Sequence, residues 1–287
     1  MFSKMTTTIV GIGQIGGSFA LALKQNKIGE KIIGVDLEEV ISNPLIKRIV
    51  DFPSSDLKES ISKADFIFLA TPVNTVIKLI PEIVSYMKPS AILLDSGSTK
   101  REICKKMKDF PEYILIGGHP ITGTEKAGFS SANPSLFKNK VFTLTFPNEK
   151  SLEGKNFVYK ILNGIGSIPV EISAEQHDEF LSLTSHLSYI LALALTFLAK
   201  EKIEKFQFIK KLIGNGFLST SRLALTDEEM GFGILKTNSR NIIEIIEEYI
   251  EKLNYIKNLI ESDKTNEIKE LLKLLKEFQI NLFKVRK

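Results

Sequence analysis

The chain has 287 residues, enough for one large domain or two ordinary ones, and 43% of them are hydrophobic, which is ample for buried cores. Charged residues make up 25% of the chain, a share that argues against a disordered or membrane-embedded protein. The formal net charge is only +4, and no arginine cluster is interleaved with aromatic residues, so we expect no nucleic-acid partner.

The cysteine content and the apolar runs indicate in which cellular compartment the protein is expected. Cys104 is the single cysteine, which excludes an intrachain disulfide and a thiolate metal cage, and no metal site is predicted. Residues 1–8 lead directly into a predicted strand and not into the apolar core of a signal peptide. The longest apolar run, residues 189–199, is too short to cross a bilayer. We therefore expect a cytoplasmic protein with no membrane partner.

The first half of the chain alternates short apolar runs with amphipathic helical patterns. Strands are predicted, in chain order, at residues 8–10, 31–36, 64–70, 91–95 and 113–117. Because strands separated by helices form parallel sheets with right-handed crossovers, we predict an α/β domain with a Rossmann-like, doubly wound, mostly parallel sheet. Residues 141–146 alternate with period two and extend this sheet, and residues 168–171 add a strand near an edge, where Pro169 is tolerated.

From Ser173 onward the pattern predicts only helices. Ser173 and Gln176 have the spacing of a capping box that opens a long helix, which continues through Lys200. Residues 187–198 are apolar nearly all round, as expected of a helix buried on every side. We therefore predict two domains: residues 1–171 form a dinucleotide-binding domain, and residues 172–287 form an all-α domain.

A glycine-rich turn follows the first predicted strand and opens a helix. Its three glycines have the spacing G-x-G-x-x-G, with Gln14 and Ile15 between the second and the third. Gly11 permits the tight turn, Gly13 lets the backbone approach a pyrophosphate, and Gly16 lets helix and strand pack closely. The backbone amides at the helix N-terminus favour a phosphate group there. The pattern predicts a dinucleotide site; the alternative is a purely structural turn.

Two further segments complete the predicted cofactor site. Asp36 ends the second strand, twenty residues beyond Gly16, where its carboxylate can accept both ribose hydroxyls. Because a carboxylate there repels a 2′-phosphate, NAD is favoured over NADP. Thr71 and Pro72 follow the third strand, at the carboxyl edge where nucleotide-fold ligands collect, although they are equally compatible with a simple helix start.

Polar segments also follow the fourth and fifth strands, at residues 95–100 and 117–125. Both leave the carboxyl edge of the sheet, so Ser98 and His119 are predicted to meet above the nicotinamide. Histidine suits proton transfer because its unperturbed pKa lies near neutrality. A lone histidine in a loop is more often a packing residue, but the position of His119 in Gly-His-Pro at a strand end favours a functional role.

At this point the sequence resembles the prephenate dehydrogenase family. The matching segments, in order, are Val10–Ser18, Gly118-His119-Pro120, Gly123-Thr124-Glu125, Thr184-Ser185-His186-Leu187 and Ser221-Arg222-Leu223-Ala224. They extend over most of the chain, and their order and spacing together are specific. The resemblance implies an NAD-dependent oxidative decarboxylation of prephenate to 4-hydroxyphenylpyruvate, the precursor of tyrosine, by a homodimer whose helical domain binds substrate.

The resemblance also implies residue roles. The family's catalytic histidine falls on His119, and its serine partner falls on Ser98, a hydroxyl able to hold the imidazole. Its substrate-binding arginine falls on Arg222, whose planar guanidinium suits a carboxylate. Further positions that bind substrate, or that line or gate the site, are His186, Thr124 and Glu125. The alternative role for His186 is that of a core histidine, and the alternative for Thr124 and Glu125 is that of turn caps. We assign His177 to a structural role at a helix start.

The chain departs from the family at two positions. Ser188-Tyr189 replaces the common Pro-His, and Gly231 stands where the family often has tryptophan. Tyr189 can still donate a hydrogen bond to substrate but carries no positive charge at neutral pH, so arogenate is an alternative substrate to prephenate. The fold is also compatible with a related β-hydroxy-acid dehydrogenase and with a non-catalytic NAD-sensing module. The set of Ser98, His119 and Arg222 argues against both.

Overall fold

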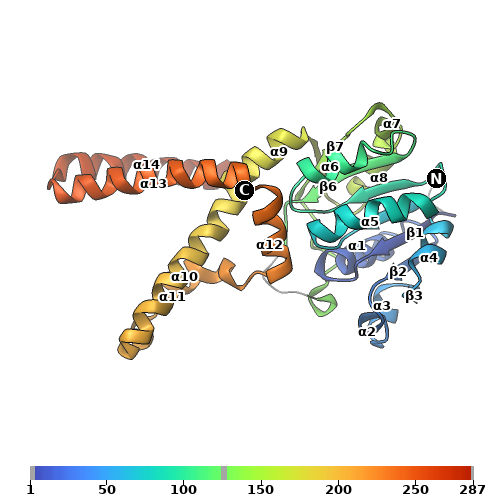
Figure 1. Ribbon diagram of the computed structural model, residues 1–287, viewed down its shortest axis with the longest axis horizontal. Helices are drawn as coiled ribbons and strands as arrows, with labels where there is room; N and C mark the ends of the chain where they lie inside the picture. The colour runs from blue at the N-terminus through green and yellow to red at the C-terminus, as the bar shows by residue number, and fades with distance from the viewer. Residues whose placement is uncertain (1–3, 124–127, 286–287) are drawn as a thin grey trace. The chain divides into compact units, whose positions relative to one another are not determined.

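The computed structural model describes residues 4–123 and 128–285 (Figure 1). The chain forms two compact units, Met1–Ser239 and Arg240–Lys287. The first unit holds the sheet and all helices through α12. The second consists of α13 (Ser239–Glu261), which starts at the boundary, and α14 (Thr265–Val285), joined by the turn 262–264. The boundary predicted after residue 171 marks the change from strands to helices, whereas the compact units divide at residue 239.

The described residues of the first unit form an eight-stranded sheet in the order β3-β2-β1-β4-β5-β6-β7-β8. All neighbouring strands are parallel except β6 and β7, which confirms the predicted doubly wound, mostly parallel sheet. The strands are β1 (Thr6–Val10), β2 (Lys31–Val35), β3 (Phe52–Ser54), β4 (Phe66–Leu69), β5 (Ile92–Asp95), β6 (Ile114–Pro120), β7 (Val141–Thr145) and β8 (Ile168–Glu171). The sequence pattern missed β3, because three residues that include a proline carry no periodicity.

Helices connect these strands, and from Ala174 to Val285 the described chain contains no further strand. Those of the sheet region are α1 (Gln14–Gln25), α2 (Glu38–Ile41), α3 (Ile46–Ile49), α4 (Leu57–Lys63), α5 (Val73–Tyr86), α6 (Arg101–Met107), η1 (Phe129–Ser131), α7 (Glu149–Leu152) and α8 (Lys155–Gly164). Those that follow are α9 (Ala174–Leu181), the π-turn η2 (Ser182–His186), α10 (Leu187–Lys205), η3 (Gln207–Leu212), α11 (Asn215–Ser221), η4 (Arg222–Leu225) and α12 (Glu228–Thr237).

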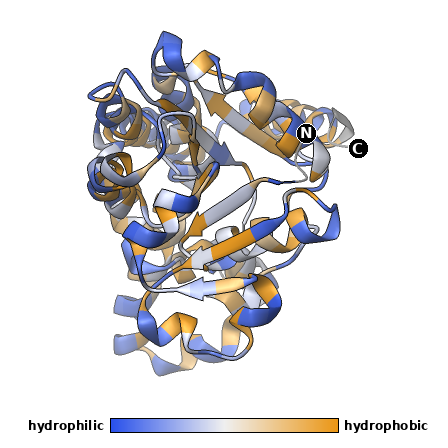
Figure 2. Ribbon diagram, turned by 90° about the vertical axis from the view of Figure 1, so that its right-hand side faces the viewer, coloured by the Kyte–Doolittle hydropathy of each residue, from blue (hydrophilic) through white to orange (hydrophobic). Residues whose placement is uncertain are grey.

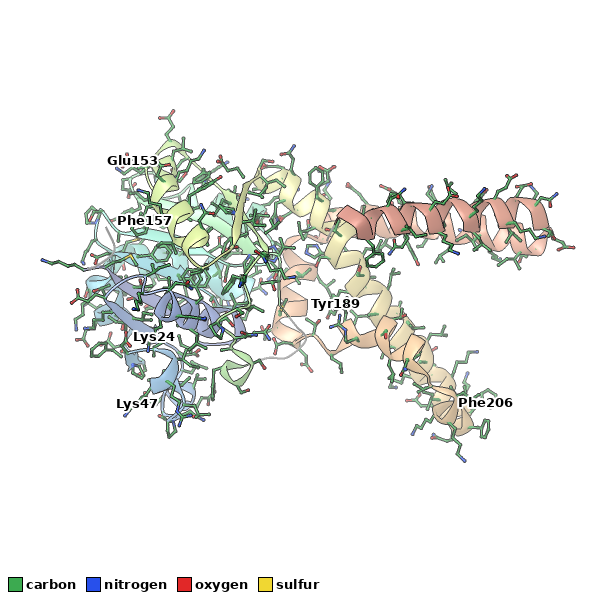
Figure 3. All side chains as sticks on the ribbon, turned by 180° about the vertical axis from the view of Figure 1, so that it is seen from behind. Lys24, Lys47, Glu153, Phe157, Tyr189 and Phe206 are labelled. Atoms are coloured by element: carbon green, nitrogen blue, oxygen red, sulfur yellow. The ribbon has the colours of Figure 1, made fainter. Side chains whose placement is uncertain are left out.

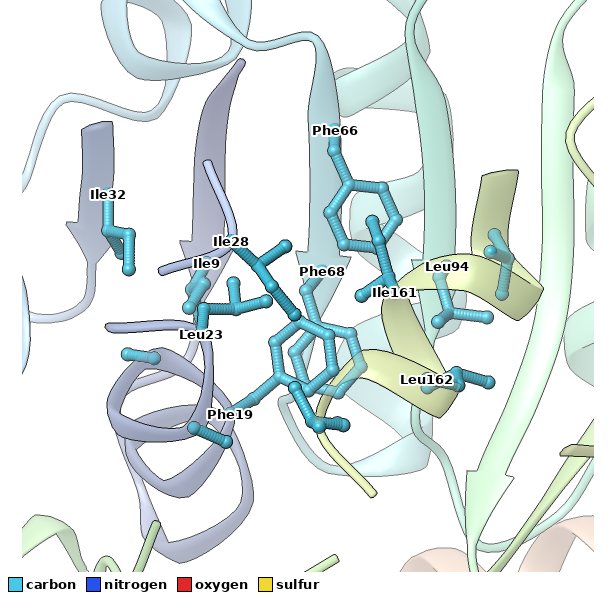
Figure 4. Packing of buried hydrophobic residues seen from close by; sticks show 14 of the residues in the cluster. Ile9, Phe19, Leu23, Ile28, Ile32, Phe66, Phe68, Leu94, Ile161 and Leu162 are labelled. Atoms are coloured by element: carbon cyan, nitrogen blue, oxygen red, sulfur yellow. The ribbon is translucent and has the colours of Figure 1, made fainter. Parts of the chain in front are cut away.

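Both faces of the sheet are buried. On β4, Phe66 and Phe68 belong to one apolar cluster, while Ile67 and Leu69 belong to the other, because successive side chains of a strand point to opposite faces. Phe19 of α1 stacks on Phe68 with ring centroids 3.9 Å apart (Figure 4). Figure 2 shows hydrophobic segments both in strands and in the helices that surround them. This two-sided burial explains why the strands are nearly continuous apolar runs.

The long helical stretch after β8 begins as predicted but is not buried as predicted. The Ser173 hydroxyl accepts a hydrogen bond from the Gln176 amide at 3.1 Å, which confirms the predicted helix start. The expectation that residues 187–198 are buried on every side is wrong for the single chain. Only Leu187 and Ala192 of α10 are buried, because η3, α11 and η4 contact only part of its surface. The helix ends at Lys205, and Figure 3 labels its C-cap residue, Phe206.

By length and hydropathy alone, residues 174–205 could cross a membrane. In the single chain, 22% of the most apolar 18-residue window of this segment is buried.

Candidate active site

The carboxyl ends of parallel strands β1, β4, β5 and β6 meet at one edge of the sheet, as expected for a nucleotide-binding fold. Helix α12 packs over this edge. The hydroxyls of Thr99 and Thr237 are 2.6 Å apart, which joins the loop after β5 to the end of α12. A Cβ added at Gly233 would lie 3.5 Å from Val73, at the start of α5. The site is therefore bounded by the sheet edge on one side and by α12 on the other.

Steric limits fix two of the three glycines in the turn after β1. Gly11 has φ +92°, and a Cβ there would be 2.5 Å from the Ala70 carbonyl oxygen. A Cβ on Gly16 would lie 1.9 Å from the Gly11 carbonyl oxygen. Gly13 is different: an added Cβ meets no described heavy atom within 4 Å, and as N-cap of α1 it offers no side-chain cap. The turn therefore leaves open space at a helix N-terminus, where a phosphate can approach closely.

Asp36 and Thr71 border the same turn. The two carboxylate oxygens of Asp36 accept hydrogen bonds from the Ile12 amide at 2.6 Å and the Leu37 amide at 2.7 Å. Each oxygen keeps a lone pair for a ribose hydroxyl. The buried Thr71 hydroxyl has no hydrogen-bond partner in the described ranges, and Pro72, the N-cap of α5, is exposed. The donor and acceptor set fits a dinucleotide with a free 2′-hydroxyl.

A fully buried ion pair between Lys100 and Asp95 holds the two polar loops together. The Asp95 carboxylate also accepts hydrogen bonds from the Gly97 amide at 2.7 Å and from the Gly118 amide at 2.9 Å. Burial raises the pKa of Asp95, and the Lys100 charge opposes that rise. One carboxylate thus anchors the residues that precede Ser98 and His119. The sequence analysis missed this pair, although a charged residue that closes an apolar strand was a usable signal.

The His119 ring is the first member of a hydrogen-bonded chain. Its Nδ1 lies 2.9 Å from Nε2 of His177, and Nδ1 of His177 lies 2.8 Å from Oδ1 of Asp178. The Asp178 carboxylate accepts hydrogen bonds from the Lys100 amide at 2.7 Å and the Arg101 amide at 2.9 Å, at the N-terminus of α6. His177 and Asp178 are fully buried. The structural role that the sequence suggested for His177 therefore needs correction, because α9 docks it directly against His119.

Ser98 lies at the same edge but does not hold the imidazole in this structure. The sequence suggested its hydroxyl as the partner of His119, whereas the partner of Nδ1 in the described residues is His177. Ser98 is half-buried, and its backbone lies close enough to His186 to raise the pKa of that ring. Ser98 therefore lies beside His186 at this edge without being the partner of His119 Nδ1.

His186 is buried in the π-turn and leaves one ring nitrogen unused. The Asn238 side-chain amide donates hydrogen bonds to the Asp178 carbonyl oxygen at 2.7 Å and to His186 Nδ1 at 3.0 Å. Neutral His186 must then carry its proton on Nε2, which is buried and has no hydrogen-bond partner within the described part of the chain. A buried donor without a partner is costly, so this N–H suits an acceptor supplied by a ligand.

The two departures from the family pattern, Tyr189 and Gly231, are in contact. A Cβ added at Gly231 would lie 2.3 Å from the Tyr189 hydroxyl oxygen, so the phenol occupies the space that a side chain at position 231 would need. Arg222 is exposed on η4, which packs against α10. Thr124 and Glu125 lie outside the described residues. The structure thus brings Ser98, His119 and His186 to one region and leaves Arg222 at the surface of the chain.

Comparison with known proteins gives the family of this chain. The nucleotide-binding domain of prephenate dehydrogenase, as a family profile, matches residues 19–170, and the dimerization domain of the same enzyme matches residues 173–277. The chain belongs to the prephenate dehydrogenase family. The matched ranges begin after the glycine turn, so the geometry of the turn supports the assignment separately.

Individual members of the family agree with this assignment. Prephenate dehydrogenase of Lactococcus lactis is 31% identical over 86% of this chain and 69% of its own length. A crystal structure of prephenate dehydrogenase from A. aeolicus, in complex with hydroxyphenyl propionate and NAD+, is 28% identical and superposes with a TM-score of 0.89 over 98% of this chain and 99% of that one. Synechocystis arogenate dehydrogenase is 26% identical, with a TM-score of 0.76 over 94% and 96%.

All three histidines of this family member have pKa values below their usual range. Burial lowers the pKa of His119 far below 6.5, and the neighbouring His177, Lys100 and His186 lower it further. Burial likewise lowers the pKa of His177, and it lowers the pKa of His186 to about 4. The rings are therefore neutral at pH 7, and His119 is in the protonation state that a general base requires.

These pKa shifts predict a loss of stability in mild acid. Below pH 6.5 the unfolded chain binds more protons than the folded one. The three neutral histidines therefore leave the free energy of unfolding undiminished above pH 6.5, and this free energy decreases as the pH falls below that value. For His186 alone the loss at pH 4 is about 3 kcal/mol. Urea unfolding between pH 7.5 and 4 measures it. His186→Asn keeps an acceptor for Asn238 but has no titrating ring, so its free energy of unfolding should decrease by about 3 kcal/mol less between pH 7.5 and 4. A pH dependence identical to that of the unsubstituted protein would contradict the lowered pKa of His186.

Proposed function

We propose that this protein is an NAD-dependent prephenate dehydrogenase that converts prephenate to 4-hydroxyphenylpyruvate and carbon dioxide in tyrosine biosynthesis. The observation that carries the proposal is a neutral imidazole, His119, at the carboxyl edge of the sheet beside an open glycine turn. The family assignment supports the same activity. The runner-up is arogenate dehydrogenase or an enzyme that accepts both substrates.

NAD, when bound at the glycine turn, supplies the hydride acceptor for C4 of the substrate ring. Its pyrophosphate would lie against Gly11, Gly13, Gln14, Ile15 and Gly16, and its adenosine ribose against Asp36. The Asp36 carboxylate, already fixed by two backbone amides, has lone pairs for the ribose hydroxyls and repels a 2′-phosphate. Thr71 and Pro72 border the same space, and the unpaired Thr71 hydroxyl is available to the cofactor.

His119 performs the proton transfer in this proposal. As hydride leaves C4, Nε2 of His119 takes the proton of the C4 hydroxyl, which becomes a carbonyl. The ring carboxylate then departs as carbon dioxide, and the electrons of that bond restore the aromatic ring and return negative charge to the oxygen. His119 gives the proton back to this oxygen, so the phenol forms and the base is regenerated. We assign the Ser98 hydroxyl as a hydrogen-bond partner of the reacting oxygen.

Substrate carboxylates require donors and positive charge. We assign the carboxylates of prephenate to Arg222 and to the unpaired Nε2–H of His186, and we keep Thr124 and Glu125 as residues that line or gate the site. The contact between Tyr189 and Gly231 favours the runner-up substrate. The phenol of Tyr189 is neutral, whereas the histidine common in the family at this position can carry a positive charge. The phenol therefore does not repel the ammonium group that arogenate has in place of the side-chain keto oxygen of prephenate.

Absorbance of NADH with prephenate, with arogenate and with neither substrate tests the proposal. Prephenate should yield NADH and 4-hydroxyphenylpyruvate in equal amounts, with NAD far better than NADP. NADH formation with arogenate alone would replace the proposal by the runner-up. NAD binding without turnover of either substrate would favour a sensing module and contradict the proposal.

We further propose a cytoplasmic homodimer in which residues 1–171 bind NAD and residues 172–287 bind substrate and dimerise. Exposed apolar side chains support it: Phe197 and Leu198 on α10; Ile250 and Ile260 on α13; Phe278 and Phe283 on α14. A membrane span is disfavoured, because residues 174–205 include the buried polar groups His177, Asp178 and His186. Sedimentation without detergent should give twice the mass of one chain; a monomer, or a need for detergent, would contradict this.

A further inference from the structure

We infer that His177 and Asp178 are positioning residues that fix the tautomer of His119 and so keep its Nε2 as the proton acceptor. The inference deepens the proposed function, because it depends on His119 being the base. It arises from three side chains linked end to end: His119 Nδ1 to His177 Nε2 at 2.9 Å, and His177 Nδ1 to Asp178 Oδ1 at 2.8 Å.

The positions of the protons follow from the Asp178 end of this chain. Both carboxylate oxygens accept from backbone amides, of Lys100 and Arg101, and these groups can only donate. Both oxygens therefore act as acceptors here, and Oδ1 faces His177 in the same role. A carboxylate has no proton to give, so His177 must carry its proton on Nδ1.

The remaining assignments follow by exclusion. Neutral His177 with a proton on Nδ1 has only a lone pair on Nε2, so the shared hydrogen must come from Nδ1 of His119. Neutral His119 then has its lone pair on Nε2. The charged and titratable groups that act on this pair of rings are Lys100, Asp95 and His186, besides Asp178 itself. The hydrogen-bonded chain of His119, His177 and Asp178, which we call the relay, thus selects the tautomer of His119 that can act as a base.

The relay also responds to the charge that forms during the reaction. When His119 has taken a proton it is an imidazolium beside Lys100, in a place where desolvation already lowers the pKa of the ring, and both effects disfavour the charged form. The negative charge of Asp178 offsets this through His177, whose hydrogen bonds hold the rings in place. The dipolar chain therefore lowers the cost of the protonated base without exposing it to water.

Asp178→Asn tests the relay. Asparagine has one acceptor oxygen for the two backbone amides, so either orientation of its side chain leaves one of them without an acceptor. With its NH2 group toward His177, the amide donates to Nδ1 of that ring. His177 then carries its proton on Nε2 and donates to Nδ1 of His119, and the proton of His119 is forced onto Nε2, where it blocks proton uptake. We expect kcat for prephenate to fall by about 10²- to 10⁴-fold, with the KM for prephenate and the Kd for NAD changed only a few-fold. Asp56→Asn is the matched control, since Asp56 caps α4 by accepting from the Glu59 amide and lies outside the site.

A spectroscopic signature separates this role from a structural one. The chain has 3 histidines, so a protein labelled with ¹⁵N-histidine gives three imidazole spin systems. In the unsubstituted protein His119 and His177 should carry their protons on Nδ1 and His186 on Nε2; in Asp178→Asn the first two should change to Nε2. His119 found with its proton on Nε2 in the unsubstituted protein would overturn the inference, as would an Asp178→Asn protein in which the tautomer of His119 and kcat do not change together.

Two variants of His177 keep the inference testable if Asp178→Asn does not fold. The side-chain oxygen of His177→Gln can accept from His119 Nδ1, so this variant should keep kcat within about tenfold, whereas His177→Leu removes the acceptor and should lose about 10²-fold or more. Equal kcat values for the two variants would contradict the relay. If the unsubstituted protein has the expected tautomers but does not oxidise prephenate, the proposed function fails while the relay stands.

Discussion

Replacement of His119 by asparagine is expected to abolish turnover of prephenate while NAD binding stays nearly intact. The asparagine amide can donate to His177 Nε2 much as Nδ1 of the imidazole does, but it offers nothing in place of Nε2. General-base catalysis contributes about 10²- to 10⁴-fold, and the loss in kcat should be of that size or larger. The substitution is far from Gly13 and Asp36 in sequence and leaves the glycine turn unchanged.

NADH formation measures the first quantity, and a fluorescence titration with NAD measures the second. The urea-unfolding midpoint of His119→Asn should stay close to that of the unsubstituted protein, so that the loss of activity is not a loss of fold. If His119→Asn turns over prephenate at the unsubstituted rate, the proposed mechanism is wrong.

Replacement of Lys100 by methionine should produce the largest loss of stability. Methionine has a similar length, but it leaves the fully buried Asp95 carboxylate without its counter-charge. Removal of one partner from a buried ion pair typically costs about 3–5 kcal/mol. Because Asp95 also holds the amides of Gly97 and Gly118, we expect kcat to fall together with the free energy of unfolding.

The double variant Asp95→Asn/Lys100→Met distinguishes the charge from the packing. The double variant removes both charges, and the side-chain oxygen of the asparagine introduced by Asp95→Asn can still accept from one of the two glycine amides. It should therefore recover much of the stability lost in Lys100→Met, as measured by urea unfolding. A single variant as stable as the unsubstituted protein, or a double variant less stable than the single one, would contradict the assigned role of the pair.

The Rossmann-like sheet was predictable because its signals are local. The apolar run of β4 buries alternate residues on opposite faces. The contacts that require glycine at Gly11 and Gly16 lie within a few residues of the turn or at the end of the neighbouring strand. The strand β3 was missed because three residues carry too little pattern.

The chemistry of the site was only partly predictable. The position of His119 at the end of a strand was visible in the sequence, but its partner His177 is 58 residues away on a helix, and no local pattern indicates that α9 docks there. The same limit applies to Asn238, which supports His186 from the end of α12. Such pairings depend on tertiary packing, which a single sequence does not encode as periodicity.

The surface of α10 illustrates a second limit. Its apolar residues predict burial, and in the isolated chain most of them are exposed, including Phe197 and Leu198. A hydrophobic pattern states that a face is covered but does not state by what. The proposed homodimer supplies a second copy of the chain as the cover.

A crystal structure of the complex with NAD and 4-hydroxyphenylpyruvate would show whether His119 stands at the reacting oxygen. We predict that the phenolic oxygen of the product lies within hydrogen-bonding distance of Nε2 of His119, with the nicotinamide ring beside it and the pyrophosphate on the turn at Gly13. A complex in which the phenolic oxygen binds elsewhere, with the His119 ring remote from the nicotinamide, would contradict it.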